Sequence, residues 1–202
     1  MRPCVILAAA PQDLQLPQDC FLIAADGGLK MAARLNRRPD LAVGDWDSAS
    51  KPADIPAVTL PHEKDDTDTH FAARWAVEQG YDEVHIYGAL GGRLDHTIAN
   101  LHTLYYLEKQ GVRAVLYGEG AEAQLLTEQE GKRSLAKREG WYLSVFAFGG
   151  TASGVDEKGV YYPLTDATLC ADFPVGVSNE FLEQKAEISV KKGNLLILQI
   201  KK

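Results

Sequence analysis

The sequence predicts an α/β fold: an N-terminal, mostly parallel sheet with helices on both faces, followed by a C-terminal antiparallel β-sandwich. In the first half, short apolar runs alternate with segments of helical spacing, which is typical of a parallel sheet covered by helices. After about residue 118 the runs are rich in Val, Ile, Tyr and Phe and are separated by turn-forming residues. The 202 residues are 46% hydrophobic and 24% charged, so the chain can bury a core unaided.

The strands of the parallel sheet are predicted at short apolar runs in the first half of the chain. These runs are Val5 to Ala9, Phe21 to Ala25, Leu41 to Val43, Val58 to Leu60, Val84 to Tyr87 and Val112 to Tyr117. Two helices are expected between them. The segment "TDTHFAARWAVEQG" stops at Gly80, and "LDHTIANLHTLYYLEKQG" has Asp95 able to cap its start and Gly111 at its end.

The second half carries β-type runs such as "WYLSVFAFGG", "GVYYPL", "AEISVKKG" and "NLLILQIKK". They predict a small antiparallel sandwich or barrel. We therefore expect two closely packed domains, residues 1–120 and residues 121–202, with the boundary between about 118 and 125.

Charge and cysteine content exclude several classes of protein. The formal net charge of -7 gives no general attraction to nucleic acids or to anionic membranes. The three cysteines Cys4, Cys20 and Cys170 are an odd count without a CxxC pair, so neither a disulfide framework nor a zinc site is expected. The start "MRPCVILAAA" is interpreted as a first strand rather than a signal peptide, and we expect a cytoplasmic protein.

Acidic residues and glycines follow four successive predicted strands, in "DGG", "GDWDS", "PHEKDDTD" and "GALGGRLDH". In an open parallel sheet, ligands bind outside the carboxyl ends of the strands. In "GDWDS", an extended chain would project Asp45 and Asp47 to one face and Trp46 to the other, with the two aspartate Cα atoms roughly 6.5 Å apart. Mg²⁺ prefers one or two carboxylates together with waters and phosphates, so this pair suits a metal–nucleotide site. A solvated strand end would have the same composition.

The segment "EKDDTD" has two interpretations. Acids at a helix start are stabilised by capping and by the helix dipole, which explains one or two of Asp65, Asp66 and Asp68 structurally. Helix-start chemistry does not explain Lys64. A lysine beside clustered carboxylates could contact phosphate while the acids hold a metal, as in a phosphoryl-transfer site.

The glycine-rich "GALGGRLDH" permits close backbone approach and offers the charged fork of Arg93. It matches neither a Walker A loop nor a complete dinucleotide fingerprint. His96 in this segment is more often a capping or packing residue than a catalytic one.

Taken in order, "ADGG", "GDWDS", "KDDTD" and "GALGGRLDHTIAN", continued by "YYPL" and "SNEF", resemble the thiamine pyrophosphokinase family. The family more usually has phenylalanine at the position of Trp46. The resemblance implies transfer of the pyrophosphoryl group from ATP to the hydroxyl of thiamine, giving thiamine diphosphate and AMP, with Mg²⁺ required. It also implies a homodimer with shared active sites. The N-terminal α/β domain would bind nucleotide and metal, and the C-terminal β-sandwich would contribute to thiamine binding and to dimerisation.

The resemblance also implies roles for individual residues. The catalytic acids would be Asp45, Asp47, Asp65 and Asp68, of which Asp45, Asp47 and Asp65 would hold the metal. The nucleotide site would be lined by Asp26, Gly27, Ser48, Lys64, Thr67, Arg93, Asp95, His96 and Asn100. Thiamine would meet Ser178, Asn179 and Phe181, with Phe181 stacking on the pyrimidine ring. Without the resemblance, "SNEF" would be interpreted as a loop between strands with Phe181 in the core.

Two other classes of function remain open from the residues. One is a metal-dependent phosphohydrolase or sugar-nucleotide transferase, which would use "GDWDS" but leave "KDDTD" and "GGRLDH" without a shared purpose. The other is a non-catalytic nucleotide-binding regulator, whose sequence would be expected to lack metal-binding acids.

Overall fold

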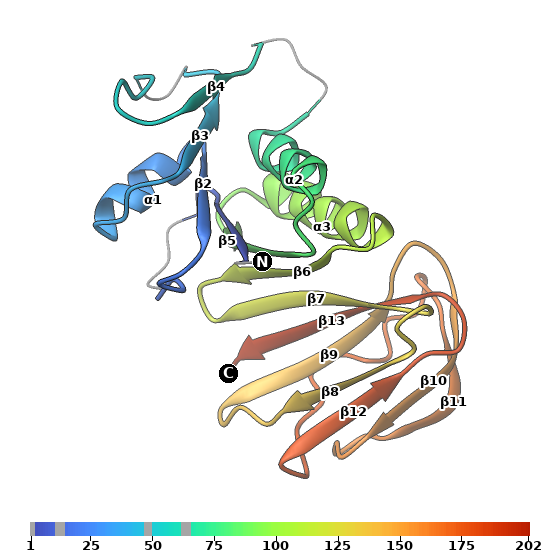
Figure 1. The fold of residues 1–202 in the computed structure, drawn as a ribbon. Coiled ribbons are helices and arrows are strands. Elements are labelled where there is room, and N and C mark those ends of the chain that lie inside the picture. The colour runs from blue at the N-terminus through green and yellow to red at the C-terminus, as the bar shows by residue number, and fades with distance from the viewer. Residues whose placement is uncertain (1–2, 11–14, 47–49, 62–65) are drawn as a thin grey trace. The chain divides into compact units, whose positions relative to one another are not determined.

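The structure is a computed structural model that describes residues 3–10, 15–46, 50–61 and 66–202 (Figure 1). The chain divides into two compact units, Met1–Glu119 and Gly120–Lys202. In the described ranges, no helix has the length and apolar character needed to cross a membrane.

The described strands of the first unit form a parallel sheet, as the sequence predicts. Their order across the sheet is β4-β3-β2-β1-β5-β6, and all neighbouring pairs run in the same direction. The strands are β1 (Cys4–Leu7), β2 (Phe21–Ala25), β3 (Leu41–Gly44), β4 (Ala57–Thr59), β5 (Glu83–Leu90) and β6 (Arg113–Gly118). Three helices accompany them: α1 (Gly28–Arg34), α2 (Asp68–Glu78) and α3 (Leu94–Lys109).

The helices cover both faces of this sheet (Figure 1). On one face, Met31 and Ala32 of α1 pack in a cluster with Val5, Leu7 and Leu22 of β1 and β2. On the other face, α2 buries alanines, and its Trp75 ring stacks on Phe21 of β2 with the ring centroids 5.3 Å apart. The predicted alternation of strands with helices on both faces is therefore confirmed.

Both predicted helices end at their glycines, but only α2 has a side-chain cap. The hydroxyl of Thr67 accepts a hydrogen bond from the His70 N–H at 3.1 Å. Gly80 and Gly111 follow the two helices with φ of +79° and +76°, the left-handed conformation that glycine adopts without strain. The predicted cap by Asp95 is wrong, because the residue before α3 is Arg93 and Asp95 lies in the first turn.

The second unit contains two antiparallel layers. One has the strand order β7-β13-β9 and the other β11-β10-β12-β8. The strands are β7 (Ala121–Thr127), β8 (Lys132–Ala136), β9 (Trp141–Ala147), β10 (Ala152–Lys158), β11 (Leu164–Leu169), β12 (Lys185–Ser189) and β13 (Asn194–Lys201). Leu143 and Ile197 of the first layer pack in one core with Val155 and Ile188 of the second. The unit is therefore the predicted sandwich rather than a barrel.

Candidate active site

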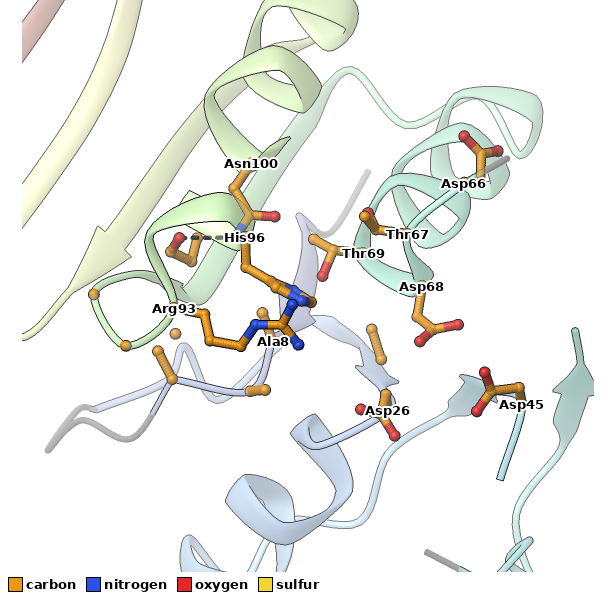
Figure 2. A pocket seen from close by; sticks show the side chains of 17 residues that line it. Ala8, Asp26, Asp45, Asp66, Thr67, Asp68, Thr69, Arg93, His96 and Asn100 are labelled. Carbon is orange, nitrogen blue, oxygen red and sulfur yellow. Dashed lines mark hydrogen bonds between the residues drawn. The ribbon is translucent and has the colours of Figure 1, made fainter. Parts of the chain in front are cut away.

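A cavity of about 530 Å³ lies at the carboxyl ends of the parallel strands (Figure 2). Its lining comes from the ends of β1, β2, β3 and β5 and from the starts of α2 and α3, because the carboxyl ends of parallel strands share one edge of the sheet. Seven of the residues predicted for the site line it together: Asp26, Asp45, Thr67, Asp68, Arg93, His96 and Asn100.

Close backbone contact forms part of the cavity wall. Gly88 has φ of +70°, and a Cβ atom there would lie 2.6 Å from the Ala10 carbonyl oxygen. The Ala10 N–H donates to the Gly88 carbonyl at 3.1 Å. A side chain at position 88 would therefore push the end of β1 away from β5, which explains the glycine.

Three aspartates from separate segments lie on one side of the cavity (Figure 2). Asp26 follows β2, Asp45 follows β3, and Asp68 is the first residue of α2. All three are partly buried. This convergence of carboxylates from distant parts of the sequence is the arrangement that the strand-end motifs predict.

The chain is not extended at Trp46, the last described residue of "GDWDS". Strand β3 ends at Gly44, and Trp46 has φ of +65°, a conformation that is rare for a bulky residue. The Trp46 indole N–H donates to the Thr59 hydroxyl at 2.9 Å, which holds this turn. The extended conformation assumed for this pair therefore does not hold at Trp46, and Asp47 lies outside the described residues.

Asp66 differs from the three converging aspartates, although it also lines the cavity. Its carboxylate lies 3.1 Å from Nη2 of Arg74 and 3.8 Å from Nε2 of His70, both on α2. Figure 2 shows it apart from the other carboxylates. Burial holds the pKa of His70 below its usual value, against the opposite effect of Asp66. One acid of "KDDTD" therefore has the structural role that helix-start chemistry allows.

The basic side of the cavity is formed by the start of α3. Arg93 donates to Asp95 through Nε at 3.2 Å and through Nη2 at 2.6 Å. This hydrogen bond lowers the pKa of the exposed Asp95 carboxyl group. Nδ2 of Asn100, which is buried, donates to the Ala89 carbonyl at 2.7 Å and ties α3 to the end of β5. Arg93, His96 and Asn100 line the cavity, whereas Asp95 orients Arg93 from outside it.

Four predicted site residues, Asp47, Ser48, Lys64 and Asp65, lie outside the described residues. Among the residues that are described, no group of three or more His, Cys, Asp or Glu side chains is close enough to hold a metal ion. Of the three predicted metal ligands the structure describes only Asp45, so the geometry of the full set stays a prediction. Gly27 follows Asp26 but does not line the cavity.

Sequence reasoning missed the segment Ala8 to Ala10 and the residue Thr69, which also line the cavity. The signal for the alanines was present, since small residues directly follow the first apolar run and so occupy the end of a strand. Thr69 carries no comparable signal, because it is an ordinary residue for a first helical turn.

Comparison with known protein families assigns both units. Residues 14–116 match the family sequence model described as "Thiamin pyrophosphokinase, catalytic domain", and residues 127–195 match "Thiamin pyrophosphokinase, vitamin B1 binding domain". The chain belongs to the thiamin pyrophosphokinase family. The match to the catalytic domain includes all the residues that line the cavity except Ala8, Ala9 and Ala10. The predicted resemblance is thus confirmed.

Similar proteins extend over the whole chain. It is 26% identical to the thiamine pyrophosphokinase of Bacillus subtilis (strain 168), over 98% of this chain and 99% of that protein. A crystal structure of the Bacillus subtilis thiamine pyrophosphokinase has a TM-score of 0.90 at 24% identity and 99% coverage of both chains. A thiamin pyrophosphokinase family protein from Enterococcus faecalis has a TM-score of 0.84 at 26% identity and 100% coverage of both chains.

The residues predicted to meet thiamine lie in the vitamin B1 binding domain and differ in exposure. Ser178 is exposed and has φ of +59°, while its N–H donates to the Ser144 hydroxyl at 3.0 Å. Phe181 is only 7% exposed and belongs to the sandwich core. A ring buried in this way has no face for stacking, so the structure supports the packing role that a strand-joining loop predicts. Asn179 is also buried.

Proposed function

We propose that this member of the thiamin pyrophosphokinase family binds Mg²⁺ and ATP in the cavity of its first unit and transfers the pyrophosphoryl group to the hydroxyl of thiamine. The products are thiamine diphosphate and AMP. One observation carries the proposal: carboxylates from β2, β3 and α2 and the guanidinium of Arg93 line a single cavity. Its volume of about 530 Å³ lies within the range of small-molecule sites.

The residues of the cavity fit a magnesium ion by the chemistry of their donors. Mg²⁺ takes one or two carboxylates and completes its shell with waters and substrate phosphates, so a group of three protein ligands is not required. We propose Asp45, Asp47 and Asp65 as the ligands, of which Asp45 lines the described cavity. A bound Mg²⁺ would neutralise charge on the triphosphate and on the leaving AMP.

The nucleotide would be positioned by Ser48, Lys64, Thr67, Arg93, His96 and Asn100, together with Asp26 and Gly27. Arg93 presents N–H donors suited to phosphate oxygens, and its partner Asp95 holds the guanidinium in place. The β-phosphorus is the atom attacked, so these residues must hold the triphosphate with that phosphorus toward the alcohol.

The transfer forms a bond between the thiamine hydroxyl oxygen and the β-phosphorus and breaks the bond from that phosphorus to the oxygen that leaves with AMP. The hydroxyl proton passes to a carboxylate, for which we propose one of Asp45, Asp47, Asp65 and Asp68. Asp68 has the geometric support that it shares the cavity with Asp45.

Thiamine itself would be bound by the second unit, through Ser178 and the neighbouring aromatic residues. Tyr161 and Tyr162 are 64% and 67% exposed, and their ring centroids are 5.0 Å apart. Exposed aromatic faces suit the fixed positive charge of the thiazolium ring, through cation–π contact. We therefore assign to this tyrosine pair the aromatic role first given to Phe181.

We further propose a cytoplasmic homodimer with shared active sites. Large apolar side chains of the second unit, such as Phe173, Val177 and Leu182, are at least half exposed, which is expected of a surface that a partner covers. Cys4, Cys20 and Cys170 form no disulfide in the structure, in keeping with a reducing compartment.

The activity is tested by incubating the protein with ATP, Mg²⁺ and thiamine. We expect AMP and thiamine diphosphate in equal amounts, with no AMP when thiamine is omitted. Free phosphate formed without thiamine would instead favour the phosphohydrolase alternative, and ATP binding without turnover would favour a regulator.

A further inference from the structure

Glu157 is a carboxylic acid inside the sandwich of the second unit. It lies on β10 and is paired across the sheet with Leu164 of β11 and Ile188 of β12, and only 1% of its surface is exposed. Burial raises its pKa to about 7, because the ionised form is poorly solvated in the core. A carboxyl group at such a position lowers stability unless its partners compensate, so those partners indicate its purpose.

The carboxyl group of Glu157 bonds to Asn179 of the "SNEF" segment. Its Oε2 atom accepts a hydrogen bond from Nδ2 of Asn179 at 3.2 Å, and its Oε1 atom has no partner among the described residues. Asn179 is only 5% exposed. The bond therefore connects two buried polar side chains that lie 22 residues apart in the chain.

All four hydrogen-bonding positions of the Asn179 amide are occupied. Besides Glu157, Nδ2 donates to the Tyr162 carbonyl at 2.9 Å. Oδ1 accepts from the N–H groups of Tyr162 and Glu180, both at 3.0 Å. An amide with four protein partners has no donor or acceptor left for a substrate. Asn179 must therefore act by holding its neighbours rather than by contacting thiamine.

The neighbours that Asn179 holds are exposed and belong to two adjoining segments. Tyr162 is bonded to Asn179 through both its N–H and its carbonyl, and Tyr161 donates its N–H to the Glu180 carbonyl at 2.9 Å. Ser178 precedes Asn179 in a left-handed conformation, which needs support from its surroundings. The Asn179 amide thus holds Tyr162 directly and Tyr161 through Glu180, while Ser178 is its neighbour in the chain and bonds to Ser144.

Resting on the proposed function, in which these segments meet thiamine, we infer that Glu157 is a positioning residue of the thiamine site. Its carboxyl group fixes the Asn179 amide, and the amide fixes Ser178 and the Tyr161–Tyr162 pair. Loss of the acceptor at Glu157 would leave a buried N–H of Asn179 unpaired, and the amide would shift to satisfy it. Thiamine binding would then weaken, while ATP binding by the first unit would not.

Substitutions at Glu157 test this inference by separating the two Michaelis constants. Glu157→Gln keeps an acceptor at the same reach, so the KM for thiamine should stay within about twofold of the wild-type value. Glu157→Asp withdraws the acceptor by one methylene and Glu157→Met removes it, so both should raise that KM about tenfold or more. The KM for ATP should stay within about twofold of the wild-type value in all three variants.

Ile188→Val is the control. It perturbs the cross-strand neighbour of Glu157 without removing a hydrogen bond, so the KM for thiamine and the KM for ATP should both be unchanged.

A folded Glu157→Asp or Glu157→Met protein with the wild-type KM for thiamine would overturn the inference. So would an Ile188→Val protein whose KM for thiamine rises as much as that of the Glu157 variants. If Glu157→Met does not fold, the KM for thiamine of Glu157→Asp is compared with that of Glu157→Gln, and this comparison decides. Amide hydrogen exchange at Tyr162 and Glu180 gives a second readout, because both N–H groups donate to Asn179. Exchange should quicken in the Asp variant but not in the Gln variant, and equal exchange in the two would refute the link. Wild-type protein that forms no AMP with thiamine would refute the proposed function instead.

Discussion

At the scale of single residues, Asp45 is the one proposed Mg²⁺ ligand that lies in the described part of the chain. It follows a buried strand and shares its cavity with Asp26 and Asp68. Asp45→Asn removes one charge without changing side-chain volume, so the fold should be retained and metal binding should weaken. We expect kcat/KM for thiamine diphosphate formation to fall about a hundredfold or more.

The measurement is a steady-state assay at fixed Mg²⁺, with circular dichroism to verify folding. Asp54→Asn is a matched control, since Asp54 is an exposed aspartate that does not line the cavity. Near-wild-type activity of well-folded Asp45→Asn protein would contradict the proposed metal site.

The sequence predicted which residues lie in the site where they directly follow a strand. It did not predict the backbone conformation where the chain turns. Asp26, Asp45 and Asp68 were found because the carboxyl ends of parallel strands must meet at one edge. The conformation of Trp46 was not predictable, because its positive φ follows from tertiary contacts such as the hydrogen bond to Thr59. Phe181 was assigned to thiamine by resemblance, although the residues alone favoured a place in the core, where the structure has it.

At the scale of elements, helix α2 begins at a side-chain cap beside the acidic residues of the cavity. Thr67 caps this helix through its hydroxyl, which accepts the His70 N–H. Thr67→Ala should lower the free energy of unfolding by about 1 kcal/mol, because a helix N–H loses its partner. Denaturation with urea measures this loss, with Thr69→Ala in the first turn as the control. Equal stability of the Thr67→Ala and wild-type proteins would show that the cap is unimportant.

The sandwich should have a pH-dependent stability that originates in β10. The pKa of Glu157 is about 7 in the folded protein against 4.5 for an ordinary glutamate, so the folded state holds the proton more tightly. The favourable contribution of the protonated group is complete below pH 4.5 and is lost as the pH rises to about 7. The groups paired with Glu157 across the sheet, Leu164 and Ile188, do not titrate.

Glu157→Gln has no proton to lose at this position. Its free energy of unfolding relative to wild type should therefore rise by about 3 kcal/mol between pH 4.5 and pH 7, and change little above that range. Urea denaturation at a series of pH values measures the difference. A constant difference across the range would show that Glu157 titrates normally.

Most elements were predictable from period and composition, and the exceptions have physical reasons. The strands β1, β2 and β3 are apolar throughout because helices cover both faces of the sheet. Strands β8 and β11, "KRSLA" and "LTDATL", were not identified because much of each is exposed and polar. Strands β7 and β10 were also not identified, and the predicted run "GVYYPL" forms no strand before Leu164. The seven-residue helix α1 is too short for a clear 3.6-residue period.

At the scale of the whole molecule, catalysis would require the two domains to act on one pair of substrates. We expect the protein to sediment at twice its chain mass of 22.1 kDa, as the proposed homodimer requires. Leu182→Lys, which places a charge on an exposed apolar position of the second unit, should weaken that association if the surface is the interface. Sedimentation velocity at several concentrations measures both. A fully active monomer would contradict the shared active site.

The division into an α/β unit and a sandwich was predictable because the hydrophobic period changes near residue 118. Which copy of the chain completes which site was not predictable, because a pattern within one sequence carries no information on the symmetry of an assembly.

The central claim is that separate strand ends of the first unit hold a magnesium-bound triphosphate in one cavity. A crystal structure with Mg²⁺ and a non-hydrolysable ATP analogue tests it most directly. We predict phosphate density between Arg93 and the aspartates, with the metal bound by Asp45. A nucleotide bound elsewhere, with Asp45 distant from both metal and phosphate, would contradict the account.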